Sequence, residues 1–225
     1  MTTSREIRLK ARPVGMPKAS DFDLATVELP APGDGEIQVK NLWMSVDPYM
    51  RGRMYDRPSY VPPFQLGEAL QGGAIGEVIA SNDPDFKPGD LVSSMFGWRE
   101  AYNAHPKSLA AAGMGAITKI ETYGLPPQAF LGVVGMPGMT AYAGLLRVAA
   151  LKDGDVVFVS AAAGAVGSIV CQIAKLKGHT VIGSAGGPEK VAFLKSIGVD
   201  HVIDYKATPD VVAELAKVAP KGIDV

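Results

Sequence analysis

Residues 155–177 constrain the fold of this 225-residue chain more than any other stretch. Four consecutive apolar residues at 156–159 form the pattern of a strand that is buried on both faces of a parallel sheet. After Gly164 the apolar period changes to three and four residues, which predicts a helix, and Gly178 stands where a left-handed glycine would end it. The predicted apolar face of that helix consists of Val166, Ile169, Val170, Ile173 and Ala174.

Small residues occupy the turn between this strand and helix, at Ala162, Gly164 and Gly167. In a strand–turn–helix unit of this kind, a dinucleotide places its pyrophosphate against backbone N–H groups at the helix N-terminus. A side chain at Gly164 would block that approach, and Gly167 would let the helix pack closely on the strand. Alanine stands where the usual pattern has its first glycine. The alternative is a small-residue turn without a ligand, which any α/β protein can contain. The predicted cofactor contacts in this turn are Ala162, Gly164, Ala165, Val166 and Gly167.

Composition excludes several classes of partner. The net charge of −1 gives no reason to expect a nucleic acid or an anionic membrane. The chain contains no run of 18 apolar residues, and its first ten residues are too polar for a secretory signal, so we expect a cytoplasmic protein. Cys171 is the only cysteine; it fits a reducing compartment, and its place in the predicted helix favours a buried small hydrophobe over a reactive thiol.

The pattern of predicted secondary structure changes near residue 130. Residues 1–130 contain short alternating stretches with frequent glycine and proline, as in a small barrel or sandwich. In residues 131–225, strands alternate with helices, which predicts the first half of a doubly wound Rossmann domain. Because only one of the two mononucleotide halves is present, we expect the chain to be part of a longer protein. The stretches predicted as strands are 7–11, 36–41, 73–80, 91–96, 180–183 and 201–204, with a further strand beginning at 223. Those predicted as helices are 140–150, 188–197 and 208–218.

Three longer motifs carry a family resemblance: SVDPYMRGRM at 45–54, LGVVGMPGMTAY at 131–142 and AAAGAVG at 161–167. Through them the chain resembles the medium-chain dehydrogenase/reductase superfamily, and within it the zinc-independent branch of NADPH-dependent 2-alkenal and enone reductases. That branch includes leukotriene 12-hydroxydehydrogenase/prostaglandin reductases and bacterial curcumin reductases, which the chain resembles most. The resemblance implies a GroES-like catalytic domain followed by a Rossmann domain, NADP as the cofactor and a homodimer.

The ligands that zinc needs are missing from the sequence. Zinc alcohol dehydrogenases of this superfamily carry a histidine at the position of Gly67, and a structural zinc lobe needs four thiolates where this chain has one cysteine. His105, His179 and His201 are scattered, so we interpret them as surface or core-edge residues. We therefore expect no bound metal.

Conjugate reduction suits a family member without zinc, because no Lewis acid is available to make an alcohol acidic. The implied reaction transfers a hydride from NADPH to the β-carbon of an α,β-unsaturated ketone or aldehyde. Tyr49 matches the substrate-side motif, and the alternative is a half-buried packing residue. Met136 and Thr140 match the motif beside the nicotinamide, with a buried turn as the alternative. For Arg51 and Arg53 we expect local ion pairs rather than contacts with an acidic substrate.

Preference for NADPH over NADH follows from the end of the second Rossmann strand. An NAD-type site has a carboxylate there for the ribose hydroxyl, whereas residues 183–187 read GSAGG. Lys190 follows in the first turn of the next helix, where its ammonium could meet a 2′-phosphate. Tyr205 matches a family position near the same phosphate. The alternatives are a solvated lysine, a lysine paired with Glu189 and a tyrosine that only ends a strand.

Two other functions remain open at this point. An NADPH quinone reductase of the same superfamily would share the cofactor and the fold. A non-catalytic nucleotide-binding protein would keep the phosphate turn but catalyse no reaction. The motif around Tyr49 favours the enone reductase over the first alternative, and the undisturbed turn at 161–167 gives no support to the second.

Overall fold

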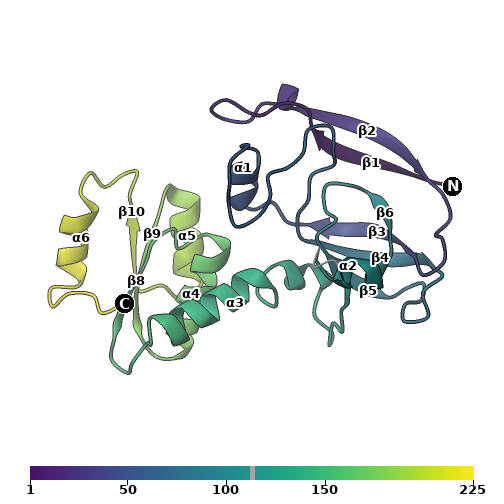
Figure 1. The fold of residues 1–225 in the computed structure, drawn as a ribbon. Coiled ribbons are helices and arrows are strands. Elements are labelled where there is room, and N and C mark those ends of the chain that lie inside the picture. The colour runs from purple at the N-terminus through teal and green to yellow at the C-terminus, as the bar shows by residue number, and fades with distance from the viewer. Residues whose placement is uncertain (112–114) are drawn as a thin grey trace. The chain divides into compact units, whose positions relative to one another are not determined.

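The computed structural model describes residues 1–111 and 115–225. It forms two compact units, Met1–Leu131 and Gly132–Val225. The first unit is built mainly of strands, and in the second unit strands and helices alternate (Figure 1). The predicted fold class, a β-rich part followed by a parallel α/β part, is therefore confirmed.

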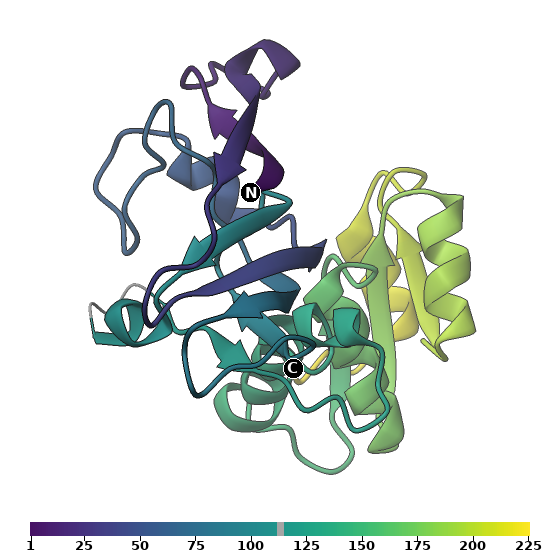
Figure 2. The same ribbon diagram turned by 90° about the vertical axis from the view of Figure 1, so that its right-hand side faces the viewer.

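The first unit is organised around a five-stranded antiparallel sheet in the order β6-β3-β4-β5-β7. Its strands are β3 (Ile37–Met44), β4 (Ala74–Ser81), β5 (Leu91–Ser94), β6 (Ala101–Ala104) and β7 (Thr118–Lys119). Two further strands, β1 (Thr2–Leu9) and β2 (Phe22–Leu29), pair with each other in antiparallel fashion and are purple in Figure 2. The helices of this unit are short: η1 (Ala19–Asp21), α1 (Tyr49–Arg53), α2 (Pro106–Ala111) and η2 (Pro127–Leu131).

Two clusters of buried apolar side chains form the interior of the first unit. Ile37 and Val39 are two residues apart on β3, so both point to the same face, where they are fully buried with Val78 and Val92. A second cluster lies around α1 and is called the α1 cluster below. Its buried members are Leu9, Met50, Met54, Phe64 and Leu70, and Tyr49 and Trp98 pack against it.

Sequence patterns located most, but not all, strands of this unit. The stretches predicted at 7–11, 36–41, 73–80 and 91–96 correspond to β1, β3, β4 and β5. Strands β2, β6 and β7 were missed. Strand β2 is exposed or half-buried along its whole length, and β6 and β7 have only four and two residues, so none of them presents a long apolar alternation. Helix α1 was also missed, since five residues are too few to show helical periodicity.

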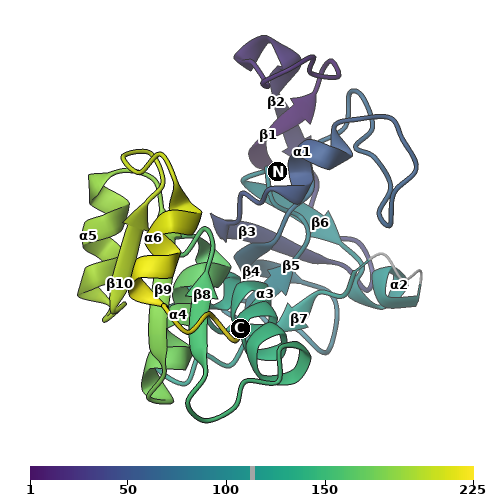
Figure 3. The ribbon, with the colours of Figure 1, turned by 90° about the vertical axis from the view of Figure 1, so that its left-hand side faces the viewer.

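The second unit has a parallel sheet in the order β10-β9-β8, formed by β8 (Val156–Val159), β9 (Thr180–Ala185) and β10 (His201–Asp204). Its helices are α3 (Met136–Ala143), α4 (Ala165–Leu176), α5 (Pro188–Ser196) and α6 (Val211–Val218), and a π-helical turn, η3 (Gly144–Val148), continues α3. Helices α4 and α5 lie on one side of the sheet and α6 on the other (Figures 1 and 3). All three predicted Rossmann strands and the helices between them are confirmed.

Burial of β8 on both faces was predicted, and this is wrong for one face. Val157 and Val159 are buried against α4, whereas Val156 and Phe158 are only half-buried. Their face of the sheet is less covered, because α6 packs against β10. At the edge of β8 away from β9, the N–H of Phe158 donates to the carbonyl of Val225 at 2.7 Å, and the N–H of Asp224 donates to that of Val156 at 3.0 Å. The strand predicted to begin at residue 223 is nevertheless not formed, since residues 222–225 have no regular secondary structure.

No helix among the described residues is both long and apolar enough to cross a membrane.

Candidate functional site: a phosphate turn and a half-buried tyrosine

The turn from β8 into α4 is held tightly against its neighbours. The N–H of Ala162 donates to the carbonyl of Ser184 on β9 at 2.9 Å, which ties the turn to the middle of the sheet. A methyl group on Gly167 would lie 2.6 Å from the Ala161 oxygen and 2.9 Å from the Ala162 Cα. Only glycine therefore allows the first turn of α4 to come this close to the chain leaving β8.

Alanine at the first position of the glycine pattern has a structural explanation. The side chain of Ala162 is fully buried, and its methyl group would be 2.9 Å from a methyl placed on Gly183 of β9. Glycine at position 183 of β9 therefore leaves the space that the Ala162 methyl group occupies. Ala161 has a φ of +47°, a left-handed conformation that is unfavourable for a residue with a Cβ.

The N-terminus of α4 is open to an anion. Gly164 is the N-cap residue, no side chain caps the helix, and its first turn contains no acidic residue. Gly164, Ala165 and Val166 are all exposed. Uncapped N–H groups at the positive end of a helix form a site for phosphate, and this arrangement fits the pyrophosphate of a dinucleotide.

The carboxyl ends of β9 and β10 are joined by Asp204. Its Oδ1 accepts hydrogen bonds from the N–H groups of Gly187 and Lys206, each at 3.0 Å. These backbone hydrogen bonds lower the pKa of the Asp204 carboxyl below its ordinary value, so it is ionised at neutral pH. A methyl group on Gly186 would lie 2.7 Å from Cζ of Tyr205, which means that the Tyr205 ring crosses the backbone of this glycine.

Lys190 is the third residue of α5, in the first turn after the N-cap residue Gly187, whose φ is +98°. Its side chain is exposed, and within residues 1–111 and 115–225 it has no ion pair with Glu189 or any other carboxylate. Of the residues predicted for this end of the cofactor, the structure brings Tyr205 against Gly186 and leaves Lys190 at the adjacent helix start. Sequence patterns did not single out Lys206, although it follows Tyr205 directly.

Met136 and Thr140 lie four residues apart on α3, so they share a face of that helix. Both are exposed, which argues against the buried-turn alternative for these two side chains. Gly138 between them is buried, and only glycine fits there, since a methyl group would be 1.8 Å from the carbonyl oxygen of Val133. The close packing of α3 on the preceding turn fixes the direction in which the two exposed side chains point.

Tyr49 is the first residue of α1 and packs against the α1 cluster. Its hydroxyl is buried and has no hydrogen-bond partner among the described residues. Burial of the side chain raises the pKa of the Tyr49 phenol, and the nearby charge of Asp47 raises it further. The group therefore remains a protonated donor at neutral pH, with its hydrogen-bonding capacity unused.

Arg51 and Arg53 were expected to form local ion pairs, and this was wrong. Arg51 lies over the Tyr55 ring at 4.2 Å and donates from Nη2 to the carbonyl of Gly15 at 2.6 Å. Arg53 lies over the Phe64 ring at 4.2 Å, and burial lowers its pKa. In the described part of the chain neither has a carboxylate within 4.0 Å. Planar guanidinium groups stack on aromatic rings and donate to carbonyls, so each arginine connects α1 to a loop of the first unit.

The described residues contain no group of three or more His, Cys, Asp or Glu that could hold a metal. His179 is buried, not at the surface or core edge as expected, and its Nδ1 lies 3.2 Å from the carbonyl oxygen of Asp155. Cys171 is fully buried, and burial raises the pKa of its thiol to about 11, which agrees with an inert core residue.

Comparison with known proteins identifies relatives along the whole chain. Residues 5–112 match a family model described as the N-terminal domain of oxidoreductase, and residues 165–225 match one described as zinc-binding dehydrogenase. The chain is 46% identical over 227 residues to a putative NADP-dependent oxidoreductase of Bacillus subtilis, YfmJ, covering all of this chain and 64% of the relative. It is 41% identical over 218 residues to the NADPH-dependent curcumin reductase of Escherichia coli, covering 96% and 61%.

A solved structure gives the same result. The crystal structure of CurA from Vibrio vulnificus in complex with NADPH superposes with a TM-score of 0.86 at 44% identity, covering 97% of this chain and 63% of that one. The chain thus spans between 61% and 64% of the length of the relatives it matches here.

Proposed function

Because the chain belongs to the medium-chain dehydrogenase/reductase superfamily, we propose that the intact protein is an NADPH-dependent reductase of carbon–carbon double bonds in α,β-unsaturated ketones and aldehydes. The observation that carries the proposal is the similarity, along nearly the whole chain, to a curcumin reductase and to a CurA structure that holds NADPH. Bound NADPH would supply a hydride; the residues of this chain would bind it, orient it and assist the substrate.

The phosphate turn supports the binding of a dinucleotide. Exposed N–H groups at the start of α4, together with the glycines at 164 and 167, leave backbone that a pyrophosphate can approach. Ala162, Ala165 and Val166 complete the proposed contact surface. Met136 and Thr140, exposed on one face of α3, are proposed to lie beside the nicotinamide.

NADPH rather than NADH is proposed from the loop after β9. Residues 183–187, at the end of β9 and in the turn into α5, have no carboxylate, and the Oδ1 of nearby Asp204 accepts hydrogen bonds from two backbone N–H groups. These hydrogen bonds to Oδ1 hold the Asp204 side chain against the backbone of the loop. Lys190 and Tyr205 flank the same loop and are proposed to bind the 2′-phosphate.

Tyr49 is proposed to contact the substrate. Reduction of the double bond places negative charge on the substrate's carbonyl oxygen, and a positioned donor at that oxygen lowers the barrier. The buried, unpartnered hydroxyl of Tyr49 is such a donor, and its raised pKa keeps the proton in place.

We also propose that the reaction uses no metal, that the protein is a homodimer and that it is cytoplasmic. Scattered histidines and a single cysteine support the first of these. Elemental analysis of the purified intact protein tests it directly, since about one zinc per chain with activity lost on chelation would overturn it. Light scattering in solution tests the homodimer.

A substrate panel tests the proposed reaction. NADPH oxidation by the intact protein would be followed with enones, quinones and saturated aldehydes, and the products analysed by mass spectrometry. Turnover of enones to saturated ketones is expected. Turnover of quinones alone would assign a quinone reductase, and NADPH binding without turnover of any compound would assign a non-catalytic protein.

A further inference from the structure

Lys206 lies beside the loop after β9, a position that the sequence did not mark. A methyl group on Gly186 would be 3.0 Å from Cε of Lys206, so the end of the lysine side chain runs along the backbone of this glycine. The N–H of Lys206 is fixed by its hydrogen bond to Asp204 Oδ1. Its ammonium, one bond beyond Cε, is thus held near the Gly186–Gly187 backbone together with the Tyr205 ring.

The positive charge of Lys206 lies close to the negative charge of Asp204 at the loop that contains Gly186 and Gly187. Asp204 is ionised, and its negative charge stands beside Gly187, where it would repel an anion. Lys206 offsets that charge, and its proximity is one of the causes that lower the pKa of Asp204. In the described part of the chain, the Lys206 ammonium has no carboxylate within 4.0 Å and is exposed, so it is available to a ligand.

We propose that Lys206 is a second cationic ligand of the adenosine 2′-phosphate, acting with Lys190 and Tyr205 to set the preference for NADPH. Gly186 is then needed because it leaves room for both the tyrosine ring and the lysine stem. This inference rests on the proposed NADPH function and adds a specificity-determining residue to it.

The expected effect is moderate. Lys206 is exposed, so its contact with a phosphate lies between an exposed ion pair and a charge-assisted hydrogen bond. Loss of the lysine should weaken binding of a 2′-phosphorylated ligand by about 3- to 10-fold, and the loss should shrink as salt screens the charges. Ligands without the 2′-phosphate should be unaffected or slightly favoured.

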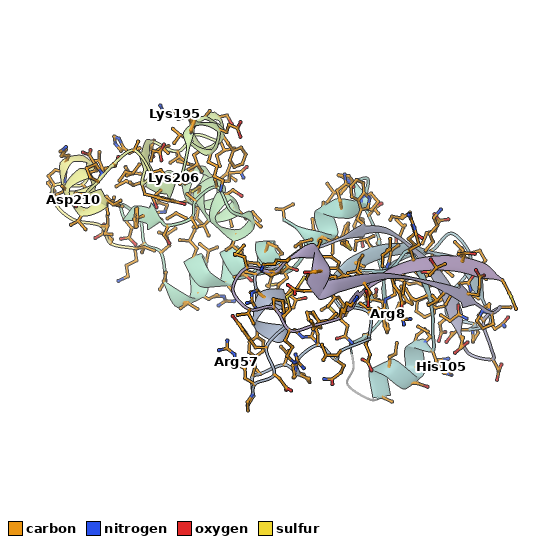
Figure 4. All side chains as sticks on the ribbon, turned by 90° about the horizontal axis from the view of Figure 1, so that it is seen from above. Arg8, Arg57, His105, Lys195, Lys206 and Asp210 are labelled. Atoms are coloured by element: carbon orange, nitrogen blue, oxygen red, sulfur yellow. The ribbon has the colours of Figure 1, made fainter. Side chains whose placement is uncertain are left out.

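Binding of adenosine fragments isolates this contact from catalysis. Calorimetry on the intact protein would compare adenosine 2′,5′-bisphosphate with adenosine 5′-monophosphate at low and high salt. The variants are Lys206→Gln, Lys206→Arg, Lys190→Gln for comparison, and the control Lys195→Gln. Lys195 is an exposed lysine in the last turn of α5, whereas Gly187 is the N-cap residue of that helix. Figure 4 labels both Lys195 and Lys206.

The inference predicts that Lys206→Gln lowers the affinity for the bisphosphate but not that for the monophosphate. Lys206→Arg should keep most of the affinity for the bisphosphate, and Lys195→Gln should change the affinity for neither ligand. Equal effects of Lys206→Gln on both ligands, or no effect while Lys190→Gln is selective, would overturn it and leave the proposed function intact. A wild-type protein that binds both fragments equally would instead contradict the proposed NADPH preference itself.

Discussion

Gly167→Ala is the perturbation that most directly tests the architecture of the phosphate turn. The added methyl group would lie 2.6 Å from the Ala161 carbonyl oxygen, whereas carbon–oxygen contacts of this type normally span about 3.3–3.6 Å. Helix α4 and the turn would have to separate by roughly 0.7 Å, and overpacking of this kind costs about 1–3 kcal/mol. A loss of about 2 kcal/mol lowers the melting temperature of a protein of this size by about 4–8 °C.

Gly144→Ala is the matched control. Gly144 also lies in a helical segment of the second unit, has a φ of −59°, and a methyl group there would meet nothing within 4 Å. Alanine at a helical position is favoured over glycine by about 0.5–1 kcal/mol, so this variant should melt slightly higher than the wild type.

Thermal melts monitored by circular dichroism, with and without NADPH, compare the two variants. Gly167→Ala should melt lower than wild type and gain less from NADPH, because the start of α4 has moved from the position that a pyrophosphate would contact. Equal melting temperatures for the two variants, or a Gly167→Ala protein stabilised by NADPH as strongly as wild type, would refute the packing argument.

Three further predictions concern single residues. Tyr49→Phe should lower kcat for enone reduction by about 10-fold or more if the phenol stabilises charge on the carbonyl oxygen, and unchanged steady-state kinetics would make Tyr49 a packing residue. Lys190→Ala should raise the KM for NADPH by about 10- to 150-fold and hardly change that for NADH, and equal losses for both would show that Lys190 only supports the fold. Burial raises the pKa of Asp200, but its hydrogen bonds from Lys175 and the Val181 N–H outweigh this and lower it. Its stabilising contribution is therefore full at neutral pH and lost as the pH falls through the lowered pKa, so an Asp200→Asn protein should show a smaller drop in stability between pH 6 and pH 3 in urea titrations than the wild type; an equal drop would count against this role.

Local patterns predicted the second unit well, because its elements are long and periodic. The apolar run at 156–159, the change of period after Gly164 and the glycine at 178 gave β8, α4 and the end of α4. Gly178 has a φ of +84°, as the left-handed helix end requires. The burial of β8 was overestimated, because a short run of valines does not indicate which face a distant helix will cover.

The candidate site was predictable only where backbone geometry follows from sequence. Small residues in the phosphate turn could be located, but the reason that Ala162 is tolerated lies in Gly183 on another strand. Lys206 was missed because its position depends on how the loop after β10 folds against Gly186. Arg51 and Arg53 were misjudged because the carbonyls and rings that they contact come from separate loops.

Transfer of a labelled hydride is the measurement that tests the central claim most directly. The intact protein would be incubated with an enone and NADPH carrying deuterium at the transferable position of the nicotinamide, and the product would be examined by NMR. The account predicts a saturated ketone with deuterium on its β-carbon. An allylic alcohol with deuterium on the former carbonyl carbon would contradict it.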